Sequence, residues 1–584
     1  MKLGSNQDLR YEVNDRPTGP LTLGLGLQFA ALCINPVVLF PTIVFRAGGA
    51  EEFLLWAVFA AVMACGLSTI LQAVRVGRIG AGYLVLHGSA AAFIAICAEA
   101  LVQGGPVMLA TLVVISGVAQ AAFSARLSLL HRVFTPVVTG TVIMLLPVTV
   151  MPILFRMLNE LPSGAPPLAG PLSASVTIAT ILGIALKGRG AVRLWAPVAG
   201  IAAGSVVGGF FGIYDTGGVA DAAWIGTPAG RLPGLDPDFS PAFWGLLPAF
   251  LFVALVGSAK SVAVAAAAQR LAWRRSRAVD FRAVQGAVAA GNLLAGLVGT
   301  MPNTPYPGSL AVVEVTGVAA RRVGVAAGIV FVVLAFLPKA LALILAIPSA
   351  VVAASIAVVM ATLFAVGMRE VMLGLGANPR NGLIAGASFW TGVAFEFDMI
   401  FPDYFAEFAG GLLSNGLTTG GLVAFLLTAL MARRKTRLRG RLDLAEVPRI
   451  TEFVQAFAAR NGLEAVVGRL EAATEETLLT LLQSRREVEE AEETAEGGGC
   501  ELLVTAYKED DEAVLEFRVG TGDGEELNLQ DRLAWLGEPT GADRLDREIS
   551  LRLLRHFASS VRHQQFHNMD VLTLRVSATS PSGS

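Results

Sequence analysis

Two segments interrupt otherwise apolar stretches with Gly, Pro and small polar residues, and they are the first candidates for chemistry. They cover residues 77–89 and 299–309. Residues 302–307 contain three prolines, which excludes a regular helix there. An extended stretch leaves backbone groups unpaired, and a helix that follows it directs its positive N-terminal end toward the same place. The pair therefore predicts a ligand site suited to carbonyl oxygens or an anion.

The composition shows that these two segments belong to a part of the chain that is embedded in the membrane. Of the 584 residues, 54% are hydrophobic and 15% are charged, whereas about a quarter of the residues of a soluble protein are charged. Charged residues are sparse up to about Leu430 and dense from Arg433 onward. The first part therefore belongs in lipid and the second in water. The net charge of −2 averages these two parts, so no nucleic-acid partner is expected.

Apolar stretches that could cross a bilayer recur along the first part of the chain. We predict an all-α polytopic membrane protein with fourteen spans, at 20–45, 53–74, 82–102, 106–125, 134–157, 170–187, 194–213, 243–269, 283–299, 303–320, 323–343, 347–367, 382–400 and 414–432. The two interrupted segments are the third and tenth spans, which are equivalent in a seven-plus-seven inverted repeat. Interrupted helices at equivalent positions indicate a binding site near the membrane midplane.

The charges of the loops predict the orientation of the chain. Arg and Lys are concentrated in the even-numbered loops, such as 270–282, while odd-numbered loops such as 214–238 are acidic or nearly uncharged. Basic loops stay in the cytoplasm, so both termini are predicted to be cytoplasmic in a bacterial-type inner (plasma) membrane. The predicted domains are an N-terminal tail (1–17), a transmembrane transporter domain (18–432), a basic juxtamembrane linker (433–449), a cytoplasmic α/β regulatory domain (450–578) and a disordered tail (579–584).

The region after the last span begins with a basic cluster, 433–441, that would lie beside anionic lipid headgroups as a topology anchor. The patterns that follow predict helices at 450–460, 470–482 and 546–561, an acidic linker at 487–499, and strands at 501–507, 513–519 and 570–576.

This order resembles the histidine-kinase-type ATPase domain of anti-sigma factors. Leu479 or Thr480 stands where that family has a magnesium-binding Asn, and residues 520–524 lack the first Asp of its adenine motif. We therefore predict a regulatory or dimerisation module without a cofactor, with ATP binding as the alternative.

The tenth span carries the most specific motif of the chain. It reads GTMPNT over residues 299–304 and continues as EVTGVAARRVG over 314–324. This resembles the signature G-T-x-P-x-T … T-G-V-x-S-R-x-V-G of the nucleobase–ascorbate transporter family, which includes uracil and xanthine permeases. The resemblance covers residues 18–432. It implies a substrate-carrying core of spans one to four and eight to eleven, a gate or dimerisation domain of the other spans, and elevator-like alternating access in a homodimer.

The chain departs from the family at its substrate-binding positions. The family usually has Gln-His in the first span, and this chain has Gln28-Phe29. Gly257 stands at the usual glutamate of the eighth span, and Gly308-Ser309 stands where the tenth has Glu or Gln followed by Asn. A buried carboxylate can accept two N–H bonds from a nucleobase and can carry a coupling proton, so its loss puts both recognition and coupling in doubt.

Other ionisable residues near these positions are candidates for the same site. Lys260 follows Gly257 by three residues and shares its helical face, so it would favour an anion unless it pairs with Glu314 or snorkels. Glu314 and His87 are candidates for coupling, the alternatives being a structural ion pair or a solvated end for Glu314 and a packing role for His87. The predicted substrate contacts are Gln28, Phe29, Ala91, Gly257, Lys260, Ser261, Gly308 and Ser309.

We therefore predict a secondary active transporter of the nucleobase (uracil/xanthine) permease fold that moves a small polar solute by an elevator-like mechanism, with proton or ion coupling left open. One alternative is a small-anion transporter or exchanger built around Lys260, and another is a membrane sensor that signals through its C-terminal domain. An enzyme is not expected, because the sequence shows no nucleophile–base pair and no metal-ligand spacing. Cys33, Cys65 and Cys97 lie inside apolar runs and are predicted to be small buried hydrophobic residues.

Overall fold

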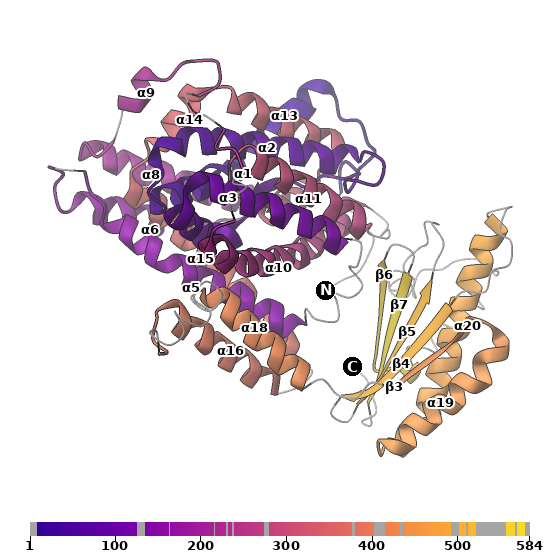
Figure 1. Ribbon diagram of the computed structural model, residues 1–584. Coiled ribbons are helices and arrows are strands. Elements are labelled where there is room, and N and C mark those ends of the chain that lie inside the picture. Colours follow the sequence, from indigo (N-terminus) through magenta and orange to yellow (C-terminus); the bar gives the residue numbers. More distant parts are fainter. Residues whose placement is uncertain are drawn as a thin grey trace. The chain divides into compact units, whose positions relative to one another are not determined.

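The computed structural model describes residues 9–124, 135–162, 164–214, 217–228, 230, 232–235, 239–273, 280–375, 380–401, 415–431, 436–491, 501–509, 512–520, 556–566 and 569–577. The chain forms two compact units (Figure 1). The larger unit comprises residues 8–272 and 281–430, and the smaller one includes residues 431–584. Each unit is described by itself below.

The larger unit is built from helices and two short strands. Its helices are α1 (Gly19–Ala47), α2 (Leu54–Val74), α3 (Ile94–Ser124), α5 (Pro136–Asn159), α6 (Ala169–Lys187), α7 (Ala191–Leu194), α8 (Ala196–Phe210), α9 (Gly217–Asp221), α10 (Pro241–Ala272), α11 (Phe281–Leu297), α12 (Gly308–Thr316), α13 (Arg321–Ala335), α14 (Pro338–Leu345), α15 (Ser349–Leu375), α16 (Arg380–Glu396) and α18 (Gly416–Leu430). The short elements are η1 (Glu51–Phe53), β1 (His87–Ser89), η2 (Ala91–Phe93) and β2 (Asn303–Pro305).

Seven of the described helices are long and apolar enough to cross a membrane, and the bent pair of α13 and α14 would make eight. The chain is therefore a multi-pass membrane protein. The shorter apolar helices α8 and α18 and the interrupted segments fall within predicted spans. The total of fourteen crossings stays a prediction.

The eleventh predicted span, 323–343, is not one continuous helix. α13 ends at Ala335, and α14 starts at Pro338 with its axis turned by 86°. A residue before proline is driven out of the helical region, and Leu337 indeed has φ −114° and ψ 73°. The third and fourth predicted spans run together as α3, which is broken at Gly105, where φ is +70°.

The helices of the larger unit pack in two groups. α1, α2, α3, α10, α11 and α13 contact one another, while α5, α6, α8, α15, α16 and α18 form the second group. This grouping follows the division between spans one to four and eight to eleven and the remaining spans. Close helix approach relies on small residues, as membrane helices require. At the contact of α2 with α13, a Cβ on Gly66 would lie 2.8 Å from the carbonyl oxygen of Gly328.

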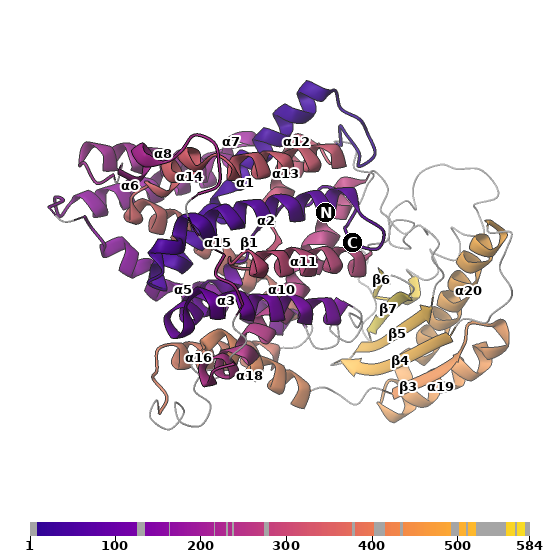
Figure 2. The same ribbon diagram turned by 45° about the horizontal axis from the view of Figure 1, so that its top comes forward.

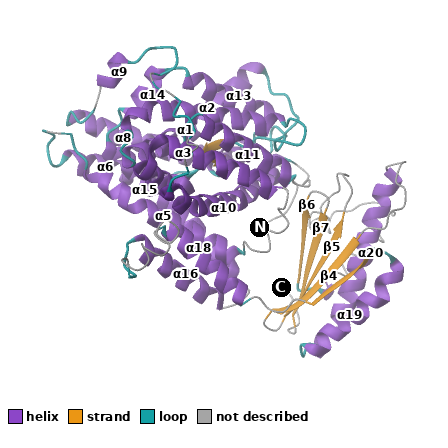
Figure 3. Ribbon diagram, viewed as in Figure 1, coloured by secondary structure: helices purple, strands orange, loops and turns teal. Residues whose placement is uncertain are grey.

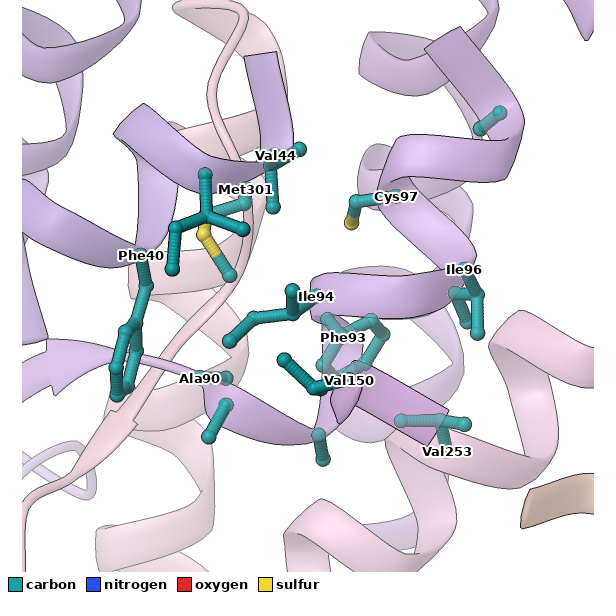
Figure 4. Packing of buried hydrophobic residues seen from close by; sticks show 14 of the residues in the cluster. Phe40, Val44, Ala90, Phe93, Ile94, Ile96, Cys97, Val150, Val253 and Met301 are labelled. Atoms are coloured by element: carbon teal, nitrogen blue, oxygen red, sulfur yellow. The ribbon is translucent and has the colours of Figure 1, made fainter. Parts of the chain in front are cut away.

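The largest hydrophobic cluster surrounds the start of α3. Phe93 and Ile94 lie among side chains that come from α1, α5, α10 and the residues before β2 (Figure 4). The labelled neighbours are Phe40, Val44, Val150, Val253 and Met301. These side chains pack against the third segment from several sides. Helices from several parts of the larger unit therefore fix the positions of η2 and of the start of α3.

The smaller unit contains a five-stranded antiparallel sheet of order β3-β4-β5-β7-β6. The strands are β3 (Thr436–Arg441), β4 (Glu501–Glu509), β5 (Glu512–Gly520), β6 (Ser560–Phe566) and β7 (Met569–Ser577). The helices α19 (Val447–Arg460) and α20 (Val467–Ala491) lie along one face of the sheet (Figure 1). Phe517, Leu515 and Leu574 of this face pack against Phe457 and Leu470. The predicted small α/β domain is confirmed.

The boundaries of this domain differ from the prediction in three places. Residues 436–441 of the predicted linker form the edge strand β3, because Arg437, Arg439 and Arg441 alternate with less exposed residues at the period of a strand. α20 continues into the predicted acidic linker as far as Ala491. β6 occupies the end of the predicted helix 546–561, since it pairs with β7.

The predicted N-terminal tail is partly ordered against the larger unit. The backbone N–H of Ala319 donates to the carbonyl oxygen of Tyr11 at 2.9 Å, and Leu9 and Val13 are buried. The predicted disordered tail 579–584, the cluster 433–435 and residues 521–524 lie outside the described residues.

Candidate functional site

The third and tenth segments meet as two short antiparallel strands inside the larger unit (Figure 2 and Figure 3). β1 pairs with β2 so that Gly88 lies opposite Thr304. The pairing extends at both ends: the N–H of Tyr306 donates to the carbonyl oxygen of Leu86 at 2.8 Å, and that of Ala90 donates to Pro302 at 2.8 Å. The prediction that these segments are non-helical and lie together is confirmed. Their backbone groups satisfy each other, as an apolar environment requires.

A helix begins directly after each strand. η2 and then α3 follow β1, and α12 begins at Gly308 after β2. Ala91 is 7% exposed and Ser309 is fully buried. The Ser309 hydroxyl donates to the carbonyl oxygen of Tyr306 at 2.8 Å, so its proton is already used. The paired strands β1 and β2 are called the crossing below. The positive N-terminal ends of both helices therefore lie next to the crossing.

α10 passes the same crossing and contacts η2, β2 and α12. The rings of Phe93 and Phe250 lie 5.9 Å apart between centroids. Two turns further along α10, a Cβ on Gly257 would lie 3.9 Å from Phe93 and Gln120 and 4.0 Å from Thr304. Position 257 therefore faces both interrupted segments, and it is called the open position below because a Cβ there would make only ordinary contacts.

Lys260 and Ser261 follow one turn after Gly257. The Ser261 hydroxyl donates to the carbonyl oxygen of Gly257 at 2.7 Å. Lys260 is partly buried and makes no hydrogen bond or ion pair with any residue that the structure describes. Glu314 is exposed on α12 and likewise has no ion pair in the described chain. The alternative in which these two residues pair is therefore wrong.

Tyr306 is a site residue that the sequence reasoning missed. Its aromatic ring lies over Gly308, and a Cβ at position 308 would collide with the ring and come within 2.9 Å of the phenol oxygen. The tyrosine thus occupies the space in which a side chain at 308 would lie. The sequence offered Tyr306 only as part of a Pro-Tyr-Pro turn, and its direction depends on tertiary packing.

The first span reaches the crossing through Pro36 and Val37. The Pro36 ring would lie 3.5 Å from a Cβ on Gly88, and the Ser89 hydroxyl donates to the carbonyl oxygen of Val37 at 3.2 Å. The predicted contacts Gln28 and Phe29 lie about two helical turns earlier on α1. Phe29 is fully buried, and Gln28 is partly buried without a hydrogen bond in the described chain.

Five buried polar side chains form a continuous hydrogen-bonded chain behind the crossing. Gln72 lies 3.2 Å from Nε2 of His87, and Nδ1 of His87 lies 2.7 Å from Oδ1 of Asn303. The backbone N–H of Asn303 donates to Asn292, which donates to Gln120, both at 2.7 Å. All five are at most 1% exposed. The network ties both strands to α2, α11 and α3.

The partners in this network determine the tautomer of His87. Nδ2 of Asn303 donates to the carbonyl oxygen of Gly291 at 3.1 Å, so its Oδ1 is the atom that accepts from His87. Oε1 of Gln72 accepts from the N–H of Ala81 at 2.9 Å, so its Nε2 donates to His87. His87 is therefore neutral with its proton on Nδ1. The geometry favours the packing role over coupling for His87.

The described residues contain no group of three or more His, Cys, Asp or Glu that could hold a metal ion. In the smaller unit, the Thr480 hydroxyl donates to the carbonyl oxygen of Glu476 at 2.7 Å. It is thus used within its own helix, and nothing in the described part of that unit supports a nucleotide site.

Comparison with known proteins now shows the family. Residues 21–399 match the model described as the permease family, Xan_ur_permease. This chain belongs to the xanthine/uracil permease family. The matched segment ends before the C-terminal domain, which is therefore an addition to the permease. Because its relatives are permeases, the chain is a transporter and no enzyme.

The permease is similar to several bacterial transporters over most of their length. It is 27% identical to the nucleobase transporter PlUacP of Paenibacillus larvae over 71% of this chain and 95% of that one. It is 25% identical to the xanthine permease XanP of Escherichia coli over 74% and 96%. It is 26% identical to the uric acid permease PucJ of Bacillus subtilis over 70% and 92%. The transmembrane domain of the cyanobacterial bicarbonate transporter BicA gives a TM-score of 0.47 at 16% identity, covering 71% of this chain and 99% of that one.

The buried network generates a stability prediction. Asn303→Leu leaves the buried His87 N–H without its acceptor, which costs on the order of 1–3 kcal/mol, and also removes the second hydrogen bond to the Gly291 carbonyl oxygen. We expect a clearly lower melting temperature of the purified permease in detergent. Gln103→Leu, on an exposed position of α3, is the control and should melt like the parent. If Asn303→Leu and Gln103→Leu have the same melting temperature, the network does not stabilise the permease and the prediction is wrong.

The contact of Tyr306 with Gly308 generates a second prediction. Gly308→Ala should lower the melting temperature, because the new Cβ collides with the tyrosine ring. Tyr306→Ala removes that ring, so the double variant should be more stable than the two single changes predict, by about 0.5–3 kcal/mol of coupling. Gly24→Ala, with open space around its Cβ, is the matched control. If the effects of the two single substitutions on stability add up in the double variant, the Tyr306 ring does not cover position 308.

Proposed function

We propose that this permease is a secondary active transporter that moves a small polar solute of the nucleobase type across the inner membrane. The observation that carries the proposal is the crossing of β1 and β2 beside Gly257, where two helix N-termini and an open position meet. Support also comes from relatives whose names state nucleobases, xanthine and uric acid. In this proposal, the ligand binds between the crossing and α10.

The elevator-like movement that we propose uses the two helix groups. The group containing α3, α10 and both strands is the core that carries the ligand, and the group containing α5 and α15 is the gate and the contact in a homodimer. Each group has its own internal packing, and fewer elements connect them than connect helices within each group. Such a division allows the core to move as a body with its site intact.

The side chains at the crossing supply few of the groups that a nucleobase needs. With glycine at 257 and 308, recognition falls to backbone groups, to Phe93 as an apolar wall and to the Tyr306 phenol. Of the two coupling candidates, Glu314 is exposed on α12 and His87 is held inside the network. We propose that any coupling ion or proton acts without a carboxylate at positions 257 and 308.

Filling the open position tests the proposed site. Gly257→Leu places a side chain between Phe93, Gln120 and Thr304, where its Cβ makes ordinary contacts. In proteoliposomes we expect uptake of radiolabelled uracil, xanthine or urate to fall tenfold or more, while the melting temperature stays close to that of the parent. Gly183→Leu on α6, with no atom within 4 Å of its Cβ, should transport normally.

Two results would overturn this proposal. If the parent protein transports none of these solutes but binds one of them, the chain acts as a sensor and not as a carrier. If Gly257→Leu transports as well as Gly183→Leu, the ligand does not lie beside α10.

A further inference from the structure

Lys260 carries a charged side chain in the middle of the membrane helix α10. The nucleobase site proposed above assigns no role to this charge. Lys260 lies twelve residues before the end of α10 at Ala272 and nineteen after its start at Pro241. A charge at this depth is costly, and such residues mark substrate or ion paths. The side chain is partly buried, and the described residues offer it no carboxylate partner.

The place of Lys260 on α10 indicates where its charge lies. Lys260 is about 18 Å along the helix from the nearer end of α10, at 1.5 Å for each residue. Its helical face is also the face of Gly257, which looks onto Phe93 and Thr304 of the interrupted segments. The charge therefore belongs to the interior of the core and lies one turn from the open position.

The absence of side chains at 257 and 308 has an electrostatic consequence. A carboxylate at 257 would lie three residues from Lys260 on the same helix, close enough to form an ion pair. Within the part of the chain that the structure describes, glycine leaves the ammonium group without a counter-charge, one turn from position 257, which faces segments whose helix N-termini also favour negative charge. A neutral nucleobase would leave that charge unpaired and desolvated, whereas an anionic ligand would satisfy it.

We propose that Lys260 makes this permease selective for heterocycles that carry a negative charge at neutral pH. The inference rests on the proposed function and specifies the substrate class of the same site. Oxidised purines with an acidic N–H fulfil the requirement, and urate, a monoanion at neutral pH, is the probe. The ammonium group of Lys260 pairs with the delocalised charge of the ring, and the Tyr306 phenol, which bonds to none of the described residues, donates to a ring carbonyl oxygen.

Uptake of a charged and an uncharged substrate tests this proposal. Purified permease is reconstituted in proteoliposomes at neutral pH, and initial rates are measured for radiolabelled urate and uracil. We expect the parent to prefer urate, and Lys260→Gln to lose tenfold or more of its urate uptake with a much smaller effect on uracil. Lys260→Arg keeps the charge and should retain part of the urate uptake. Lys187→Gln, at the end of α6, is the control and should change neither.

A second variant tests the same charge while keeping the lysine. The Cβ of Gly257→Glu meets nothing closer than 3.9 Å, and a carboxylate there would lie one turn from Lys260. A side chain at 257 lowers uptake of both solutes, so we compare residual uptake: the ratio of urate to uracil should be tenfold or more lower in Gly257→Glu than in the equally large, uncharged Gly257→Gln. If Lys260→Gln and Gly257→Glu leave this ratio unchanged in folded protein, the inference is wrong while the transporter proposal stands. If the parent transports neither substrate, the proposed function fails as well.

Discussion

Extended backbone inside a membrane must find hydrogen-bond partners, and this constraint organises the larger unit. The third and tenth segments meet it by pairing with each other over three residues each and by two further bonds from Ala90 and Tyr306. Both strands are then held by amide side chains from α2, α3 and α11. Because each side chain in that network has defined partners, the ends of the two following helices are fixed in place, and a ligand can use them without reorganising the protein.

The hydrogen bonds that hold the crossing are independent of the candidate ligand-binding positions. Strand pairing and the network from Gln72 to Gln120 involve neither Gly257 nor Gly308. Gly257 can therefore vary without loss of the hydrogen bonds that hold the scaffold. The environments of Gly257 and Gly308 differ, since a Cβ on Gly257 would make ordinary contacts and Gly308 is covered by the Tyr306 ring. Position 257 carries no side chain and position 308 is covered by a phenol, so the charged side chain on this part of α10 is that of Lys260.

The sequence predicted the features that depend on local chemistry. Three prolines in residues 302–307 exclude a helix, and alternation over residues 513–519 predicts β5, so both appear where expected. It could not predict features that depend on distant partners. The ring of Tyr306 lies over Gly308 only because of the surrounding packing, and β3 was read as a linker because its partner β4 is sixty residues away. Gln72, Asn292 and Gln120 were visible as amides in apolar helices, yet their connection required the structure.

The position of a bound anion tests the account most directly. A cryo-EM structure of the permease in lipid nanodiscs with saturating urate would show whether the ligand lies at the crossing. The account predicts density for the purine between Gly257 and the ends of β1 and β2, with Nζ of Lys260 within hydrogen-bond distance of it. Density for urate away from α10, or a Lys260 ammonium that points away from a ligand bound at the crossing, would contradict it.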